Sequence, residues 1–246
     1  MRLTIVGSGD AFGSGGRMNT CFHLQTAKAT LLIDCGASAL PALKALPVDP
    51  NMIDAVVLSH LHGDHCGGLP FLILDGRFSR REKPLLIAGP PGTKDRLHTL
   101  MEACFPKSTG TPWKFEWYVE EIAVGVPAQV LGHELVTAEV IHQSGAPSTA
   151  LRLSDGDKVF AYSGDTEWTD ALLPIARDAD LFICECYAFA GQLNGHLTWE
   201  ILQTKLGALG AKRTMVTHMN PTMLAKRDEA RAAGVLVAED KLVVEF

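Results

Sequence analysis

Residues 53–70 of the chain read IDAVVLSHLHGDHCGGLP. The stretch opens with an apolar run, Ala55 to Leu58, whose length and β-branched content are typical of a buried strand. Side chains that can bind metals follow this run at four of the next seven positions: His60, His62, Asp64 and His65. Imidazole and carboxylate groups are ligands of divalent metals, so the stretch predicts a metal site at the end of a buried strand.

Glycines accompany the predicted metal ligands and also fill a loop near the start of the chain. We expect Gly63 and Gly67 to relieve steric limits where the backbone curls around an ion. The second loop, GSGDAFGSGGRMNT at residues 7–20, is too long for a tight hairpin. Loops of this kind often line a site, and the absence of a following GKS or GKT argues against a phosphate-binding P-loop.

Composition limits the classes of partner that the chain can have. It has 246 residues, 47% of them hydrophobic, and no linker or low-complexity segment, so we expect residues 1–246 to form one domain. A net charge of −6 gives no general basic face for nucleic acid. No apolar run approaches the ~20 residues that span a bilayer.

The six cysteines form no CxxC motif and no dense disulfide framework. We therefore expect free thiols in a reducing compartment. The first residues, MRLTIVGSGD, begin a strand and lack the apolar core of a signal peptide, which favours a cytoplasmic location.

Periodicity predicts a mixed α/β chain. We expect strands at residues 3–6, 21–25, 30–33, 55–58, 84–88, 135–141, 150–153, 158–162, 181–184 and 214–217, with two short terminal strands and only short strands within 107–132. Helices are expected at 37–46, 69–78, from a Thr93 cap to Cys104, and after a Thr198 cap, with a last helix ending near Gly234. In each half of the chain, several expected strands and a helix are thus followed by a short strand, and a residue that can bind a metal lies at the end of that strand.

Further candidate ligands lie just after predicted strands. His142 and His218 each follow such a strand, and Asp165 does the same within SGDT. We expect structural roles for three other histidines: His23 inside a strand, His98 in a helix and His133 in a turn.

The sequence HLHGDH resembles the HxHxDH signature of the metallo-β-lactamase-fold hydrolases. Segments along nearly the whole chain resemble the ribonuclease Z-like phosphodiesterase branch of that superfamily: GSGDAFGSGGRMNT, LLIDCG, GPPGT, HQSGAPSTALRL, SGDT and THMNP. The resemblance implies a four-layer αββα sandwich, in which two mixed sheets are covered by helices on the outside.

The resemblance also implies a ligand set for two divalent metal ions. His60, His62 and His142 would hold one ion, Asp64, His65 and His218 the other, and Asp165 would bridge them. We expect Zn²⁺, and such ligands also accept Mn²⁺ or Fe²⁺. The implied reaction is attack by a hydroxide that bridges the metals, with Asp64 orienting it or accepting its proton.

A motif of the same branch places a catalytic histidine before a helix. Here it corresponds to His196 in GHLTWE, paired with Glu185 in CECY. The resemblance implies that His196 donates a proton or stabilises the phosphoryl oxygens. This motif favours a phosphodiester over a thioester or lactam as substrate.

One departure from the branch affects the expected substrate. Ribonuclease Z enzymes that mature tRNA carry a long arm between the His142-type and Asp165-type motifs, but here Arg152 reaches Tyr162 through a tight turn. We therefore expect a small phosphodiester, a cyclic nucleotide or a short RNA-like molecule, instead of tRNA. The resembling family is often homodimeric. Two alternatives remain: a lactone, thioester or β-lactam hydrolase on the same metals, and a non-catalytic cofactor-biosynthesis or binding protein.

Overall fold

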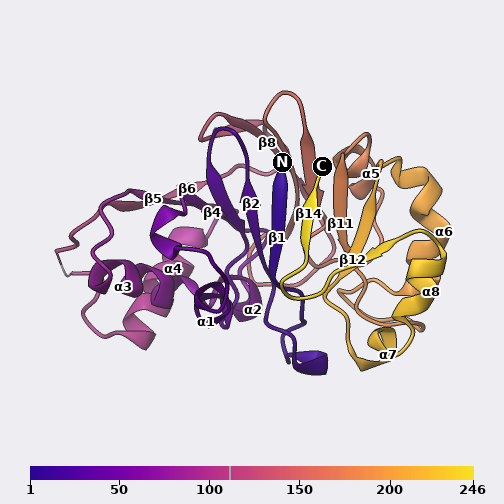
Figure 1. Cartoon of the computed structure of the whole chain (residues 1–246), viewed down its shortest axis with the longest axis horizontal. Helices are drawn as coiled ribbons and strands as arrows, with labels where there is room; N and C mark the ends of the chain where they lie inside the picture. The colour runs from indigo at the N-terminus through magenta and orange to yellow at the C-terminus, as the bar shows by residue number, and fades with distance from the viewer. Residues whose placement is uncertain (111) are drawn as a thin grey trace.

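Two seven-stranded sheets lie face to face at the centre of the molecule, as Figure 1 shows. The computed structural model describes residues 1–110 and 112–246. The first sheet has the order β14-β1-β2-β3-β4-β5-β6, and the second has the order β13-β12-β11-β10-β9-β8-β7. The two termini lie close together, where the amino group of Met1 donates a hydrogen bond of 2.7 Å to the carbonyl of Phe246.

The two sheets are built in the same way. The first contains β1 (Arg2–Gly7), β2 (Cys21–Gln25), β3 (Thr30–Ile33), β4 (Ala55–Val57), β5 (Leu85–Gly89), β6 (Trp117–Glu121) and β14 (Val243–Glu245). The second contains β7 (Ala128–Val130), β8 (His133–Glu139), β9 (Thr149–Ser154), β10 (Val159–Tyr162), β11 (Leu181–Glu185), β12 (Thr214–Thr217) and β13 (Leu236–Val237). In the first sheet the pairs from β14 to β3 are antiparallel and those from β3 to β6 are parallel. In the second the pairs from β7 to β10 are antiparallel and those from β10 to β13 are parallel.

Helices of the two halves of the chain lie on opposite sides of the sheets (Figure 1). On one side are α1 (Ala39–Lys44), α2 (Gly63–Cys66), α3 (Leu69–Phe78) and α4 (Thr93–Cys104). On the other are α5 (Leu172–Ala176), α6 (Trp199–Leu209), α7 (Pro221–Leu224) and α8 (Arg227–Ala232). Two short 3₁₀ helices complete the elements, η1 (Ser14–Gly16) and η2 (Pro50–Met52).

Three apolar clusters fill the spaces between these layers. One lies between the sheets and includes Ile5, Phe22 and Phe160. The other two pack each sheet against its own helices, through residues such as Leu43 and Met101 on one side and Trp199 on the other. Strands buried on both faces read as continuous apolar runs, which is how β4 and β11 are recognisable in the sequence. The layers form the αββα sandwich of the metallo-β-lactamase fold, as predicted.

Most predicted elements match the structure, and a few local predictions were wrong. Thr93 is the first residue of α4, and Gly92 at φ 96° precedes it as the cap. Thr198 does precede α6, but its side chain makes no capping hydrogen bond. His133 opens strand β8 instead of lying in a turn, because its ring is held inside the sheet edge by the carbonyl of Val130 and the hydroxyl of Thr26.

The stretch 107–132 contains β6 and β7, in line with the short strands predicted there; residue 111 lies outside the described residues. All six cysteines, which are within the described residues, are free thiols. No helix in the described parts of the chain is long and apolar enough to cross a membrane.

Candidate metal centre

The carboxyl ends of the parallel strands in both sheets meet at one edge of the sandwich, and the candidate site lies there. Residues at or just after these ends supply the site: Asp34 after β3, His60 after β4, Asp165 after β10, Glu185 at the end of β11 and His218 after β12. The carboxyl ends of parallel strands are where ligands bind in open α/β sheets. Short buried strands therefore position side chains that are far apart in the chain.

A first group consists of three histidines. Nitrogen atoms of His60, His62 and His142 lie within 4.8 Å of one another. Nε2 of His142 is 2.9 Å from Nδ1 of His62, although 80 residues separate them. Imidazole nitrogens that lie this close together on different loops can bind one metal ion jointly.

A second group contains Asp64, His65, Asp165 and His218, whose ligand atoms also lie within 4.8 Å of one another. Oδ2 of Asp165 is 3.3 Å from Nε2 of His65 and 3.2 Å from Nε2 of His218. Oδ2 of Asp64 lies 3.3 Å from the same His65 nitrogen. This group offers carboxylate and imidazole ligands together.

Asp165 is placed between the two groups. Its Oδ2 is also 3.9 Å from Nε2 of His60 and 4.0 Å from Nε2 of His142. The structure thus brings all seven predicted ligands together, from four separate segments that follow strands of the two sheets. His23, His98 and His133 belong to neither group.

Hydrogen bonds on the far side of the ring orient four of the five ligand histidines. The Nδ1 atom of His65 is 2.7 Å from Asp34, that of His60 is 3.0 Å from Ser59, and that of His142 is 2.7 Å from the carbonyl of Gly195. Nδ1 of His218 is 3.3 Å from the hydroxyl of Thr20. These partners leave the Nε2 atoms facing the centre, and such outer partners fix ring orientation in metal sites.

Several buried atoms of the predicted ligands have no hydrogen-bond partner, as expected where a divalent cation binds. Nε2 of His60, Nε2 of His65 and Oδ1 of Asp165 are buried and have no hydrogen-bond partner among the described residues. A buried polar atom without a partner is costly, and it calls for an explanation such as an ion. Ten buried side-chain atoms lack a partner within the described residues, and these three are the ones that belong to the predicted metal ligands.

The charge states also suit cations. Burial lowers the pKa of His60, His142 and His218, so these rings are neutral near pH 7 and their lone pairs are free. Burial opposes the charge of Asp165, but His218 and His65 outweigh it and hold the pKa of that carboxyl well below its usual range. His65 differs: Asp165 and Asp34 outweigh burial and raise its pKa, so a cation there would take the place of a proton.

The sequence reasoning gave no role to Asp34, which supports the centre from beneath. It is fully buried at φ 58°, in the left-handed region that few non-glycine residues adopt. Its carboxylate accepts hydrogen bonds of 2.7 Å from the backbone N–H and the hydroxyl of Ser59, in addition to its contact with His65. The sequence feature that marks this residue is an aspartate directly after a buried strand, followed by Cys35 and Gly36.

The loop after Asp34 packs against the HGDH turn so closely that it requires glycines. A Cβ on Gly36 would collide with the carbonyl oxygen of Asp64, and one on Gly68 with the carbonyl of Gly36. Gly67 is likewise too close to the carbonyl of Gly63 for a side chain. The prediction for Gly63 itself was wrong, since a Cβ there would meet no atom within 4 Å.

Glu185 and His196 form a pair beside the two groups. Nδ1 of His196 is 3.0 Å from Oε1 of Glu185, which also accepts a 2.6 Å hydrogen bond from the backbone N–H of Thr166. Burial raises the pKa of Glu185 to about 7. Burial opposes the charge on His196, but Glu185 outweighs it and raises the pKa of the imidazole to about 9.

A cavity of about 300 Å³ opens onto the centre. Its lining includes Ala11, Phe12, His62, Gly63, Asp64, His142, Asp165, Tyr187, His196 and His218. The rings of Tyr187 and His196 stack at a centroid distance of 4.6 Å and an angle of 25°. Tyr187 and Phe12 are not among the site residues expected from the sequence.

Comparison with known proteins places the chain among metal-dependent hydrolases. The family model described as "Anti-Pycsar protein Apyc1" matches residues 1–242. The probable metallo-hydrolase YhfI of Bacillus subtilis is 30% identical over 232 aligned positions, which cover 89% of this chain and 87% of YhfI. The crystal structure of YhfI, a metallo-β-lactamase-fold protein, superposes with a TM-score of 0.82 at 25% identity and covers 100% of this chain and 99% of that one.

Ribonuclease Z proteins are also similar. That of Anoxybacillus flavithermus is 25% identical over 294 aligned positions, covering 99% of this chain and 93% of the relative. Because the alignment is longer than the 246 residues of this chain, the relative carries segments that are missing here. The short form of human tRNase Z has the same fold, with a TM-score of 0.81, 24% identity and coverage of 100% of this chain and 99% of that one.

Proposed function

Because the chain belongs to the Anti-Pycsar protein Apyc1 family and to the ribonuclease Z-like metallo-β-lactamase-fold hydrolases, we propose that it is a phosphodiesterase with two divalent metal ions that acts on a small phosphodiester, such as a cyclic nucleotide. The observation that carries this proposal is the Glu185–His196 pair beside the seven clustered ligands. A protonated histidine next to the metal ligands suits a phosphodiester, whose leaving oxygen must take up a proton.

The seven clustered side chains would hold the ions. His60, His62 and His142 form one set, Asp64, His65 and His218 the other, and Asp165 reaches both. Bound there, two divalent ions lower the pKa of water so that hydroxide is available at neutral pH, and they neutralise the negative oxygens of a phosphodiester. Zn²⁺ suits this histidine-rich set, and Mn²⁺ or Fe²⁺ would also accept it.

Asp64 is positioned to accept the proton of the attacking water. It is one of the less buried members of the ligand set and lines the cavity. Oδ2 of Asp64 lies 3.3 Å from Nε2 of His65, which orients the carboxylate at the wall of the cavity. We assign to Asp64 the general base, a role that carboxylates fill in hydrolases.

His196 is positioned to give a proton to the leaving oxygen. Its ring lines the cavity and stacks on Tyr187, while Glu185 holds its Nδ1 atom. The carboxylate of Glu185 favours the protonated imidazole, so the Nε2 atom carries a proton to deliver. Glu185 itself is fully buried and acts by positioning and charging His196.

The shape of the site favours a small substrate over tRNA. Strands β9 and β10 are joined by a tight turn, in which Ser154 pairs with Val159, so no arm projects between the His142 and Asp165 motifs. A cavity of about 300 Å³ lies at the lower end of the range for small-molecule sites. The net charge of −6 also opposes the many phosphate contacts that tRNA requires.

Turnover of matched substrates tests the proposal. Metal-loaded protein should hydrolyse bis(p-nitrophenyl) phosphate and 3′,5′-cyclic nucleotides, whereas nitrocefin and simple lactones should be turned over at least about 100-fold more slowly. His196→Ala should abolish most phosphodiesterase activity, and the exposed His98→Ala serves as the matched control. Faster hydrolysis of lactones, unaffected by His196→Ala, would instead establish the carbonyl hydrolase. Less than one bound ion per chain together with no turnover would point to a binding protein.

A further inference from the structure

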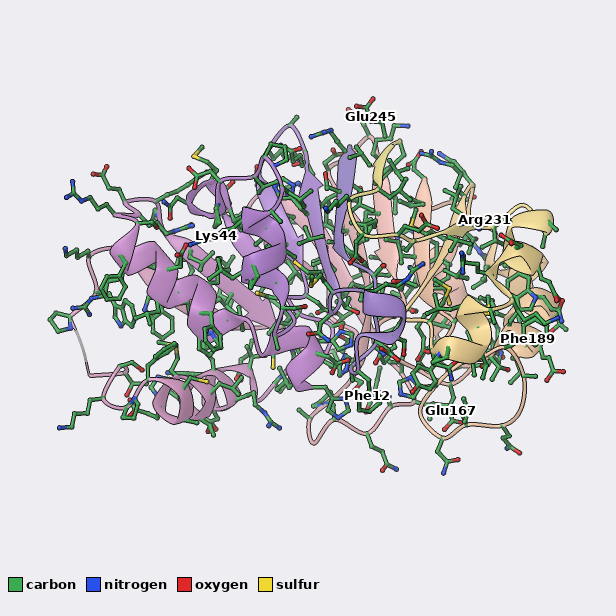
Figure 2. All side chains as sticks on the ribbon, turned by 60° about the horizontal axis from the view of Figure 1, so that its bottom comes forward. Phe12, Lys44, Glu167, Phe189, Arg231 and Glu245 are labelled. Atoms are coloured by element: carbon green, nitrogen blue, oxygen red, sulfur yellow. The ribbon has the colours of Figure 1, made fainter. Side chains whose placement is uncertain are left out.

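The most exposed large apolar side chain of the described structure lies at the mouth of the catalytic cavity. Phe12 is 83% exposed, and it lines the same cavity as the clustered metal ligands. Figure 2 shows Phe12 at the same edge of the molecule as Glu167, away from Lys44 and Arg231. Single exposed apolar side chains are common on protein surfaces, but Phe12 differs from Phe78 and the others in lining the cavity that holds the candidate ligands.

The backbone beneath Phe12 is held in place. Asp10 is fully buried, and its carboxylate accepts hydrogen bonds from the backbone N–H of Phe12 at 3.2 Å, from the N–H of Ser14 at 2.9 Å and from the hydroxyl of Ser14 at 2.7 Å. Asn19 donates a further hydrogen bond of 3.0 Å to the carbonyl of Asp10. The loop therefore presents the ring from a fixed base, although the ring itself packs against little of the protein.

Apart from Phe12, Ala11 and Gly63, the residues that line the cavity are polar or charged. Five of the seven candidate ligands line it, and the stacked rings of Tyr187 and His196 form another wall. A phosphodiester bound to the ions would place its phosphate on the floor and its other parts toward the rim. Phe12 offers those parts an apolar ring face and no hydrogen-bonding group.

We propose that Phe12 is a specificity-determining residue whose ring stacks on the nucleobase of the substrate, so that the enzyme selects nucleotides among small phosphodiesters. The inference rests on the proposed phosphodiesterase function and adds the part of the substrate that Phe12 recognises. Stacking of a base on an aromatic side chain tolerates any base, because every base has a π-face. Alanine substitution of such a platform lowers affinity by roughly 5- to 150-fold.

Two substrates that differ only in the base test this role. They are a 3′,5′-cyclic nucleotide and its abasic counterpart, methyl ribofuranoside 3,5-cyclic phosphate. Phe12→Ala should lower kcat/KM for the nucleotide by about 10-fold or more and leave that for the abasic compound within about 2-fold. Phe12→Trp should retain the preference. Phe78→Ala removes another exposed phenylalanine, 77% exposed on α3 and far along the chain, and should change neither value.

A binding measurement separates this inference from the proposed function. By titration calorimetry on metal-loaded protein, a nucleoside monophosphate should bind about 10-fold more tightly than ribose 5-phosphate, and Phe12→Ala should remove the difference. Equal losses on both cyclic substrates, or no loss on either, would overturn the role of Phe12 while the phosphodiesterase stands. If wild-type protein turned over neither substrate, the proposed function would fail, and calorimetry would still decide whether Phe12 contacts a base.

Discussion

Nδ1 of His196 lies 3.0 Å from Oε1 of Glu185, and the two residues reach each other from opposite ends of the segment between β11 and α6. Glu185 is fully buried at the end of its strand, whereas His196 lines the cavity. The buried carboxylate thus orients the half-buried imidazole, and we expect the two residues to act as a unit.

A double-mutant cycle tests this unit. His196→Ala should lower kcat by about 10²- to 10⁴-fold, the range for loss of a general acid. Glu185→Gln should cost less, about 10- to 100-fold, and the double variant should be no slower than His196→Ala alone. Circular dichroism verifies folding of each variant. Losses that multiply in the double variant would show that the two residues act independently.

Metal content should depend on each ligand in a different way. By plasma mass spectrometry we expect two ions per chain in the wild type, about one in His142→Ala and fewer than one in Asp165→Ala, because the Asp165 carboxylate lies within reach of both groups. His98→Ala should keep both ions. Removing the ions with a chelator should lower Tm, since a metal that binds only the folded state stabilises it by about 4 kcal/mol at 1,000 times Kd. An Asp165→Ala protein with two ions would contradict the assigned bridge.

Asp34→Ala should weaken metal binding without removing a ligand. Loss of an outer carboxylate that holds a histidine ligand typically costs about 10- to 100-fold in metal affinity, which competition with a chromophoric chelator measures. Asp54 is the matched control, because its carboxylate accepts a hydrogen bond of 2.9 Å from the N–H of Thr30, within the same sheet but away from the site. Asp54→Ala should lower stability and leave the metal affinity unchanged. If both variants lost metal affinity equally, the loss in Asp34→Ala would reflect a general structural change and not the contact between Asp34 and His65.

Precursor tRNA should be a poor substrate. The tight β9–β10 turn leaves no arm to grip it, so cleavage at the 3′ end should be at least about 100-fold slower than hydrolysis of a small diester by the same preparation. Gel analysis of the RNA products beside a cyclic-nucleotide assay gives both rates. Comparable rates would refute the expectation of a small substrate.

Asp180 should make stability depend on pH at the acid end. Its carboxylate accepts hydrogen bonds from the N–H of Val159 at 3.0 Å, from Lys158 at 3.1 Å and from Lys212 at 2.9 Å. Burial opposes ionisation, but these partners outweigh it and lower the pKa of Asp180 to about 2. A pKa lowered by folding stabilises the protein above the unfolded-state value of about 4, and this contribution is lost as the pH falls toward 2.

Urea unfolding of metal-free protein measures this contribution. Asp180→Asn should lower the free energy of unfolding by about 1–2 kcal/mol at pH 7, and the difference from wild type should shrink between pH 4 and pH 2. Asp157→Asn removes an exposed carboxylate from the nearby β9–β10 turn and should change little. A difference for Asp180→Asn that stays constant down to pH 2 would show that the ionised carboxylate is not its source.

The sequence by itself indicated a mixed α/β chain and the positions of the candidate metal ligands. Buried strands such as β4 and β11 are largely apolar runs, and a polar side chain shortly after the end of a buried strand emerges at the edge of a sheet. This local signal sufficed for His60, Asp165 and His218. The HLHGDH stretch added the resemblance that implied the four layers.

Only the tertiary structure decided which of these side chains meet and which residues assist them. Asp34 reaches His65 because β3 pairs in parallel with β4, with Ile33 opposite Val57, and no local pattern encodes that register. The ring of Phe12 stands at the cavity because buried Asp10 fixes its loop, and Tyr187 stacks on His196 because the chain turns back after β11. Contacts of this kind depend on the pairing of distant segments, whose free energy is set by packing throughout the sandwich and not by neighbouring residues.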